Sequence, residues 1–490
     1  MKTIHDLPFE MIHKIFLQLD IIDRFNLICA SKHIMDLSYN VPIFFMDVAL
    51  ILSRLYKRDL NHLKYGQVCF SEVNDILKRI KKFPGIKYVN LNTGLKQGSG
   101  LVKKLNKLDM VLHHMIKDKY KFRVQAIEFD YMYGGLKSEY SLDAYENLRH
   151  LVIDVTNKQY DEYGHALGDG DQYPEFSNQS FFGQEIWSKL ETFVYKTDDL
   201  YYYQDKFLKL CRNLKYLHLE YKSPKSNSYA LDCDNLLFDI IIGNKSLKYL
   251  NIPVNFTKTM FNELLSQLPN LEFLKCGMVE DDNSTNDCIS NIKHLNIKGG
   301  DVLKSVPKLR TFEATTMKDV NFRDIVSMSC LTQVNMRLPI VILPHITGFG
   351  KPFLNKENLF DVFGNLDGLY ERFERMEYVE FDVDPGPMLL YYNHIDTSNS
   401  DQVQNYILRS MAHYVNNNNR LKSFRLNMRS FHRVYKCHNK WYDFNNHPLI
   451  TLDFAKYRLC EVIYYTGSDY ESIIKTEYDD HKKYIKNQIK

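Results

Sequence analysis

The stretch Leu214-Lys-Tyr-Leu217-His-Leu219 shows the pattern on which most of this chain is built. An apolar residue is followed by two variable residues, a second apolar residue, one polar residue and a third apolar residue. The last three positions alternate between apolar and polar, which is the two-residue period of a β-strand with one buried face. Each such unit therefore predicts one short strand.

The same unit recurs at uneven intervals along the chain. The other copies are 86–91, 124–129, 148–153, 190–195, 247–252, 271–276, 292–297, 309–314, 331–336, 376–381, 421–426 and 449–454. Residues 202–210, 261–268 and 403–414 lie between units, and their apolar positions at three-four spacing predict helices. Strand and helix in alternation predict an α/β solenoid, and a single α/β domain with coincidental strings of this type is the alternative. The pattern resembles the leucine-rich-repeat family in an irregular form.

The amino-terminal residues predict a different element. Pro8 is suited to the first turn of a helix, and Asp6 is placed to cap the free amides there. An apolar stripe at three-four spacing follows over residues 11–19, and a second apolar run begins near Asp23. Two short helices do not form a stable core alone, so we expect their apolar faces to meet a partner domain or subunit.

This helix pair, over roughly residues 3–45, resembles an F-box. The similarity lies in Leu7-Pro-x-Glu10-x-Ile12, Ile15-Phe16, Leu19 and the later Ala30-Ser-Lys32. The resemblance implies binding to a Skp-type adaptor and, through it, to a cullin. The adaptor contacts that it implies are Leu7, Pro8, Ile12, Ile15, Phe16, Leu19 and Ile28. Where the family often has a tryptophan after the Ser-Lys position, this chain has His33 and Ile34; an amphipathic hairpin on the chain's own core is the alternative interpretation.

These patterns divide the chain into four expected regions. They are an F-box over 1–45, a helical linker over 46–85, an irregular repeat solenoid over 86–465 and a helical tail over 466–490. Insertions are expected near 154–185, which is acidic and rich in aromatic residues, and near 337–375, which contains several prolines and glycines. Either insertion could contact a partner or be a mobile insertion with no role.

The resemblance implies a non-catalytic protein, the substrate-recognition subunit of an SCF-type cullin ubiquitin ligase. A protein client would bind the strand face of the solenoid through exposed polar positions between the apolar ones. The candidate client-binding residues are His218, Asn251, Lys275 and Asn296. An adaptor-bound scaffold that acts outside ubiquitin transfer, in a trafficking, transcriptional or chromosome-associated complex, is the alternative.

Charge is distributed unevenly although the net charge is only +3. Residues 54–123 contain 17 Lys and Arg against five Asp and Glu. Such a field could steer a phosphorylated or acidic partner, or nucleic acid, but a solvated helix exterior explains it better because lysines dominate. We therefore do not expect a nucleic-acid partner.

Other functional classes leave no signal in the sequence. Nine scattered cysteines form no Cys-x-x-Cys pair, and no phosphate-binding glycine loop, dinucleotide fingerprint or serine-nucleophile elbow is present. We therefore expect no cofactor, no metal and no catalytic residue. The polar start of the chain and its longest apolar run, Val41 to Leu52, favour an intracellular protein, cytoplasmic or nuclear, without a membrane span. That run predicts a buried helix that joins the first two regions.

Overall fold

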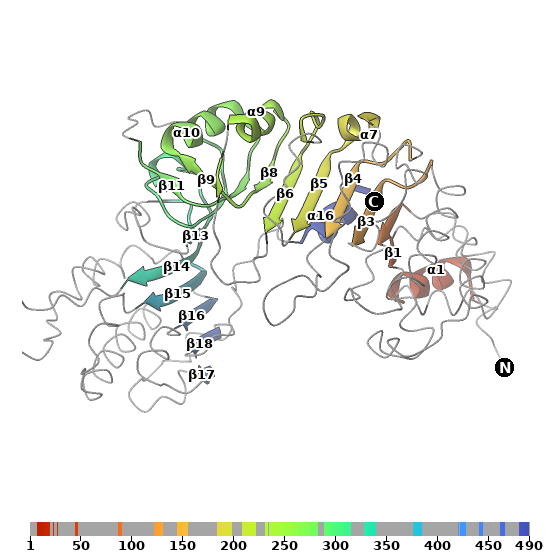
Figure 1. The fold of residues 1–490 in the computed structure, drawn as a ribbon. Helices are drawn as coiled ribbons and strands as arrows, with labels where there is room; N and C mark the ends of the chain where they lie inside the picture. Colours follow the sequence, from red (N-terminus) through yellow and green to blue (C-terminus); the bar gives the residue numbers. More distant parts are fainter. Residues whose placement is uncertain are drawn as a thin grey trace, which may run out of the picture. The chain divides into compact units, whose positions relative to one another are not determined.

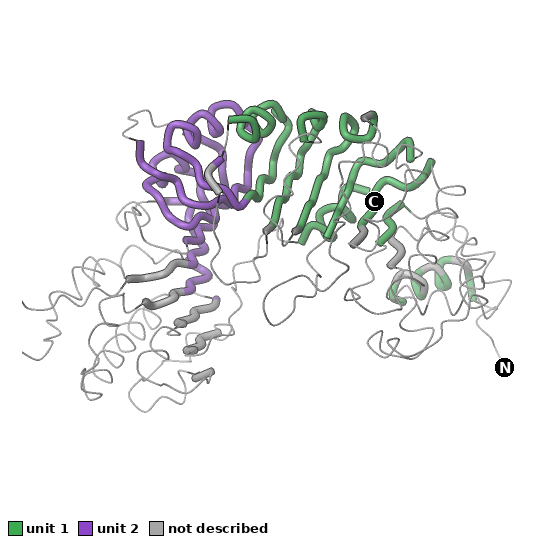
Figure 2. Tube along the Cα trace, in the orientation of Figure 1, with its two compact units in different colours: residues 1–229, 234–252, 480–490 green, residues 230–233, 253–479 purple. Residues whose placement is uncertain are grey.

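The structure is a computed structural model, and its described residues extend from the first helix to the last. They are 7–19, 23, 27, 45–47, 87–90, 122–130, 145–154, 184–197, 208–221, 231–233, 235–282, 289–314, 328–339, 376–384, 420, 422–427, 441–443, 461–465 and 480–489. The chain forms two compact units (Figure 2). Unit 1 comprises residues 1–229, 234–252 and 480–490, and unit 2 comprises residues 230–233 and 253–479.

Unit 1 is organised around parallel strands that follow one another in sequence (Figure 1). In sheet order they are β1 (Phe45–Asp47), β2 (Tyr88–Asn90), β3 (Ala126–Asp130), β4 (His150–Asp154), β5 (Thr192–Thr197), β6 (Tyr216–Tyr221) and β8 (Tyr249–Asn251). Equivalent positions of successive units lie opposite each other, as Leu151 opposes Phe193 and Phe193 opposes Leu217. The repeat pattern therefore sets the register of the sheet.

The apolar unit positions of these strands share one face of the sheet, which helices cover. Leu151, Leu217 and Leu250 have no exposed surface. α7 (Gln184–Lys189) lies on this side, because the ring of Trp187 meets that of Phe193 edge-on at 5.4 Å between centroids. α9 (Asn235–Gly243) buries four apolar side chains, Leu237, Phe238, Ile240 and Ile241. Burial of such side chains contributes about 1.5–3 kcal/mol each.

Unit 2 continues the same construction. Its strands, in sheet order, are β10 (Phe273–Lys275), β12 (His294–Ile297), β13 (Thr311–Ala314), β14 (Gln333–Pro339), β15 (Tyr378–Asp384), β16 (Ser423–Asn427) and β18 (Glu461–Tyr465), all in parallel pairs. β17 (Trp441–Asp443) runs antiparallel to β18. A 3-10 turn, η6 (Leu303–Ser305), lies between β12 and β13.

A second, smaller sheet in unit 2 consists of three short parallel strands. They are β7 (Leu231–Asp232), β9 (Val254–Thr257) and β11 (Val279–Glu280), with β9 in the centre. α10 (Lys258–Gln267) follows β9 directly, and the Thr257 side chain caps it by accepting a hydrogen bond from Met260 N at 3.2 Å. This helix matches the expectation of a helix over 261–268.

Strand positions agree closely with the repeat pattern. In twelve of the thirteen predicted units the strand begins at the third residue, as β6 does at Tyr216 in the unit 214–219. The unit 449–454, the helix expected over 403–414 and most of the one expected over 202–210 lie outside the described residues. The α/β fold of parallel strands with interspersed helices is confirmed.

One expected element is wrong. Residues 45–47 were expected within a buried helix, but they form β1, which pairs in parallel with β2 from Tyr88 to Asn90. Short apolar runs fit a strand as well as a helix, and here an available sheet edge decides between them. The insertions near 154–185 and 337–375 lie mostly outside the described residues, as does most of the basic stretch 54–123.

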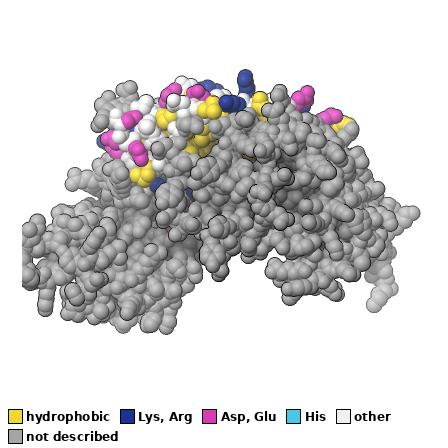
Figure 3. Space-filling model, viewed as in Figure 1, with side chains coloured by type: hydrophobic (Ala, Val, Ile, Leu, Met, Phe, Trp, Pro, Cys, Tyr) yellow, Lys and Arg dark blue, Asp and Glu magenta, His cyan; other side chains and the backbone are white. Residues whose placement is uncertain are grey.

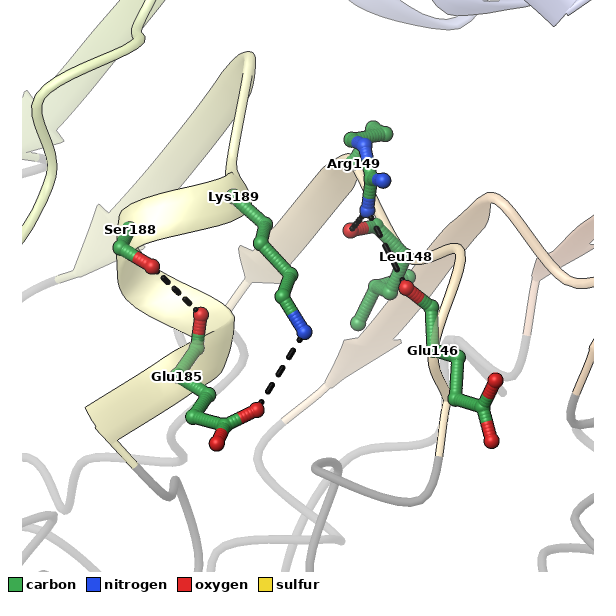
Figure 4. A network of polar contacts seen from close by, with 6 residues as sticks. All are labelled: Glu146, Leu148, Arg149, Glu185, Ser188 and Lys189. Atoms are coloured by element: carbon green, nitrogen blue, oxygen red, sulfur yellow. Dashed lines mark hydrogen bonds and ion pairs between the residues drawn. The ribbon is translucent and has the colours of Figure 1, made fainter.

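Polar side chains join successive repeats at their turns. An asparagine just before the first apolar position donates to a backbone carbonyl of the preceding repeat: Asn147 to Phe122 O, Asn213 to Ser188 O and Asn291 to Pro269 O, at 2.6, 2.7 and 3.2 Å. Within single turns, Arg149 donates to Glu146 O, Ser188 to Glu185 O, and Lys189 pairs with Glu185 at 3.4 Å (Figure 4). These exposed contacts fix turn geometry more than overall stability.

A charge pattern runs along the repeats as well. The second unit residue is often Glu in one repeat and Lys in the next, and these neighbours pair across the strands: Lys215 with Glu191, Lys293 with Glu272, and Lys422 with Glu377, at 2.7, 3.0 and 2.8 Å. In the space-filling view, both signs of charge are interspersed with hydrophobic side chains on the described surface (Figure 3). None of the described helices is long and apolar enough to cross a membrane.

Candidate functional site

The amino-terminal helix is the first candidate binding element. α1 (Phe9–Gln18) begins directly after Pro8, whose carbonyl accepts hydrogen bonds from Met11 N and Ile12 N at 3.0 and 3.1 Å. The start near Pro8 agrees with the sequence, whereas Asp6, the expected cap, lies outside the described residues. Proline suits this position because it has no amide hydrogen that the helix would leave unpaired.

The predicted adaptor residues divide into exposed and inward-facing groups. Leu7 is 36% exposed and Pro8 is exposed, whereas Ile12 is 1% exposed. Ile15 and Leu19 are half-buried, the backbone of Phe16 belongs to α1, and Ile28 lies outside the described residues. Leu7 and Pro8 are thus accessible at the start of α1, whereas Ile12 faces inward. Met11, 47% exposed, adds an apolar side chain that the sequence did not single out for contact.

The second candidate element is the sheet face of unit 1 that points away from α7, here called the tyrosine face. It carries the third and fifth unit positions, including Tyr88, Tyr216 and Tyr249. The rings of Tyr216 and Tyr249 stack 3.9 Å apart at 3° between planes. Side chains on this face are at most 2% exposed at Tyr88, Ala126, Val152, Val194, Tyr216 and Tyr249. The repeat pattern predicts that this face is exposed to solvent, whereas in the structure these side chains are buried.

The carboxyl-terminal helix lies on the tyrosine face. α16 (His481–Ile489) starts at a cap formed by Asp480, whose side chain accepts hydrogen bonds from Lys482 N and Lys483 N at 2.9 and 3.2 Å. The ring of Tyr484 lies 4.6 Å from that of Tyr216 between centroids. Ile485 and Ile489 are buried. A helix more than 260 residues distant in sequence from Tyr216 thus packs on this strand.

An ion pair and a hydrogen bond from a lysine join α16 to unit 1. Lys482 Nζ lies 3.1 Å from Glu128 Oε1 on β3, and Glu128 Oε2 accepts a hydrogen bond from the Tyr88 hydroxyl at 2.9 Å. Glu128 is only 2% exposed, so protein partners such as these take the place of water around its carboxylate. At the other end of α16, Lys87 Nζ donates to Ile489 O at 2.8 Å.

Burial shifts the pKa values of side chains on α16 and on the strands of unit 1. Desolvation lowers the pKa of His481 to about 3, with Lys196, His218 and Lys482 adding to the effect and Asp480 opposing it. Desolvation also lowers the pKa of His150 to about 4 and raises that of Tyr484 to about 12. His150 Nδ1 lies 2.9 Å from Thr192 Oγ1. The neutral forms of His481 and Tyr484 are the ones that fit the docked helix.

Docking of α16 should weaken in acid. His481 has a lower pKa when docked than its ordinary 6.5, so the undocked state binds more protons between pH 6.5 and about 3. The stabilisation is present above pH 6.5 and is lost as the pH falls, by roughly 2 kcal/mol at pH 5 from His481 alone.

The measurement is the amide protection of α16, by hydrogen exchange corrected for intrinsic rates, from pH 7.5 to 5. The groups whose charge bears on His481 are Asp480 and Lys482 beside it, Lys196 on β5 and His218 on β6, with Glu220 paired to both strand residues. His481→Gln removes the titrating ring, so its protection should change far less with pH. An equal change in both proteins would assign the acid sensitivity to other groups.

The four candidate client residues fall in two places. His218 and Asn251 lie opposite each other on the tyrosine face, and at 8% and 9% exposed they are not the exposed positions that the pattern led us to expect. Lys275 and Asn296 lie opposite each other in unit 2, where Lys275 is exposed and Asn296 is half-buried. Their role in client binding stays a prediction.

The unit 2 face that carries Lys275 and Asn296, here called the polar face, has a different chemistry. Asn296 and Asn335 both donate to the Glu313 carboxylate, the latter at 3.4 Å, and His294 Nδ1 lies 2.8 Å from Thr311 Oγ1. Polar side chains therefore follow the strands β10 to β14 in register. Thr311 and Asn335 are buried in this row, whereas Lys275 is exposed and His294, Asn296 and Glu313 are half-buried, so the accessible part of the row suits hydrogen bonding to a polar partner surface.

The described residues contain no group of three or more His, Cys, Asp or Glu placed to hold a metal ion. Cys211, Cys233 and Cys276 are buried free thiols, and desolvation raises the pKa of Cys211 to about 12, which disfavours the reactive thiolate.

The comparisons with known proteins bear on the amino-terminal region. Residues 4–46 match the model of the F-box domain. A search of curated proteins gives no match to the chain. The match includes α1, Leu7 and Pro8, and it extends over the region in which the helix pair was expected. The chain therefore carries an F-box domain at residues 4–46, followed by parallel strands with interspersed helices.

Proposed function

We propose that this protein is the substrate-recognition subunit of an SCF-type cullin ubiquitin ligase. The F-box domain at residues 4–46 carries the proposal, since it is the element that implies a Skp-type adaptor. Leu7, Pro8 and Met11 supply exposed apolar surface at the start of α1, while Ile12 anchors the helix inward. Clustered exposed apolar residues next to a buried anchor are suited to a protein interface.

The role is one of positioning. A receptor of this kind holds a client near the carrier enzyme that is loaded with ubiquitin, and so raises the local concentration of the client's lysines there. The polar face of unit 2 is the proposed client surface, because Lys275 and Asn296 are accessible there. A scaffold of parallel strands in register supports this role, since it presents side chains of successive repeats in rows.

The test compares affinity purifications of the wild-type chain and the Leu7→Ala/Pro8→Ala variant. We expect the adaptor and a cullin with the wild type, and at least a tenfold loss of both with the variant, because interface anchors of this kind contribute about 2 kcal/mol or more. Lys14→Ala/Gln18→Ala is the matched control, since both of its positions are exposed polar residues of α1. It should retain both proteins.

Other outcomes of this purification are equally informative. Proteins retained by both the wild type and Leu7→Ala/Pro8→Ala are client candidates, and Lys275→Ala/Asn296→Ala should release them while retaining the adaptor. Loss of client and adaptor together from that variant would contradict the separation of the two surfaces. If neither adaptor nor cullin accompanies the wild type, the proposed function is wrong.

A scaffold that binds the adaptor but acts outside ubiquitin transfer is the second candidate. The observation that favours it is the presence of His33 and Ile34 where F-boxes often have a tryptophan. Adaptor without cullin in the wild-type purification would support this candidate over the ligase subunit.

A further inference from the structure

The tyrosine face is more apolar than the polar face, although both carry the same positions of the repeat. At the third and fifth positions unit 1 has six apolar or aromatic residues, Tyr88, Ala126, Val152, Val194, Tyr216 and Tyr249, beside six polar ones, Asn90, Glu128, His150, Thr192, His218 and Asn251. Over β10 to β14 of unit 2 the same positions hold one apolar residue, Phe273, beside Lys275, His294, Asn296, Thr311, Glu313, Gln333 and Asn335. An apolar surface of this kind needs a cover. In this structure α16 lies on it.

The contacts of α16 are of three kinds. Ile485 and Ile489 are buried, and Tyr484 packs on Tyr216, which in turn stacks on Tyr249. Lys482 reaches the buried carboxylate of Glu128. Lys483, Asn487 and Gln488 are exposed on the remaining surface of the helix. The tyrosine face therefore accepts one basic residue, one aromatic residue and two aliphatic residues from one side of a helix.

The helix itself is too short to be stable alone. Nine residues form about two and a half turns, and isolated helices shorter than roughly 12–15 residues are marginal in water. Along the chain, residues 253–479 of unit 2 separate α16 from the other segments of unit 1. Its helical form thus depends on docking, and its docking is an intramolecular binding reaction whose strength includes a high effective concentration.

We propose that the tyrosine face is a groove for a short basic amphipathic helix, that α16 is its built-in occupant, and that a partner protein's helix of the same chemistry can replace α16. The partner helix carries a lysine or arginine for Glu128, an aromatic residue for Tyr216 and two aliphatic residues at the spacing of Ile485 and Ile489. Glu128 selects for the basic residue, because a buried carboxylate without a cationic partner is unfavourable.

This interaction surface is separate from the F-box domain, and it deepens the proposed function by giving unit 1 a partner of its own. The helix-docking proposal rests on the proposed function in one respect: the partner helix would belong to a client protein of the ligase. Docking of a helix to unit 1 does not require adaptor or cullin. Failure of one proposal is therefore distinguishable from failure of the other.

The test uses the full-length chain and a fluorescent peptide of residues 480–490. Ile485→Asp/Ile489→Asp in the chain should release its own α16, because two carboxylates would enter the apolar contact. We expect this chain to bind the peptide at least tenfold more tightly than the wild type, whose groove is occupied. Asn487→Asp/Gln488→Asp adds the same charge at exposed positions and should behave as the wild type.

Peptide variants test the chemistry of the groove. A Lys482→Glu peptide places a carboxylate beside Glu128, and a Tyr484→Ala peptide removes the ring that packs on Tyr216; each should bind at least tenfold more weakly. Equal binding of the three peptides to the released chain would overturn the proposed recognition. Absence of peptide binding to that chain would overturn the groove itself.

Two further measurements ask whether α16 is displaceable. In the wild type, hydrogen exchange of α16 amides should be at least tenfold faster than that of β4 and β5, because the helix opens without the sheet. Equal protection, or loss of the β4 and β5 protection in Ile485→Asp/Ile489→Asp, would show that α16 is a fixed part of the core. A concentration-dependent dimer of the wild type would assign the groove to α16 of a second copy and would also overturn the proposal.

Discussion

Asn244→Ala is expected to lower the free energy of unfolding of unit 1 by about 2–6 kcal/mol, because it leaves two buried backbone groups without their partner, at about 1–3 kcal/mol each. Asn244 is 1% exposed and follows α9. Its Nδ2 donates to Ile240 O at 2.8 Å, and its Oδ1 accepts from Leu214 N at 3.1 Å. One amide thus ties the end of α9 to the turn that precedes β6.

The measurement is the urea midpoint of unit 1, with hydrogen exchange to locate the change around α9 and β6. Asn213→Ala is the matched control, since Asn213 donates to Ser188 O at 2.7 Å from an exposed position. Water can replace that contact, so the control should lose less than about 1 kcal/mol. Similar losses in the two variants would contradict the role of burial in this tie.

Gly277→Ala is expected to destabilise unit 2 by a similar amount, because the backbone of β9 passes too close for a side chain. A Cβ at this position would collide with Asn255 Oδ1 and would lie 2.7 Å from Val254 O. Gly277 N donates to Val254 O at 2.7 Å, and Met278 N donates to Asn255 Oδ1 at 2.8 Å. Overpacking costs about 1–3 kcal/mol, and loss of the Met278 contact would add about 1–3 kcal/mol.

A second glycine provides the comparison for this prediction. Gly243, the last residue of α9, has open space around the position that a Cβ would take. Gly243→Ala should therefore be neutral or stabilising, by up to about 1 kcal/mol, since alanine favours a helix over glycine. Thermal unfolding of both variants beside the wild type measures the difference. A midpoint for Gly277→Ala equal to that of Gly243→Ala would show that the β9 segment adjusts freely.

The strands were predictable because their signal is local. Apolar residues at the fourth and sixth positions of each unit must face the same side, and successive units offer the same spacing to the neighbouring strand. The start of β6 at Tyr216 and of β12 at His294 follows from that rule. The asparagines that tie successive repeats, Asn147, Asn213 and Asn291, are visible in the sequence, but they stand one residue before the repeat pattern begins and so are not part of it.

The exposure of the candidate site was less predictable, because it depends on segments distant in sequence. The pattern places His218 and Asn251 correctly on the face opposite the leucines. It does not predict that this face is buried, with α16 packed on it. Likewise β1 is a strand because an edge of β2 was available to it. Periodicity gives the direction of a side chain, and only packing gives its access to water.

The sequence by itself determined the repeating parallel strands, their register and the F-box domain at residues 4–46, since each of these is encoded by neighbouring residues. The tertiary structure alone decided that α16 covers the tyrosine face, that Glu128 becomes a buried acceptor for Lys482, and that Lys275 and Asn296 remain accessible. The physical reason is that a strand's pattern specifies an apolar face without specifying which distant segment will remove that face from water.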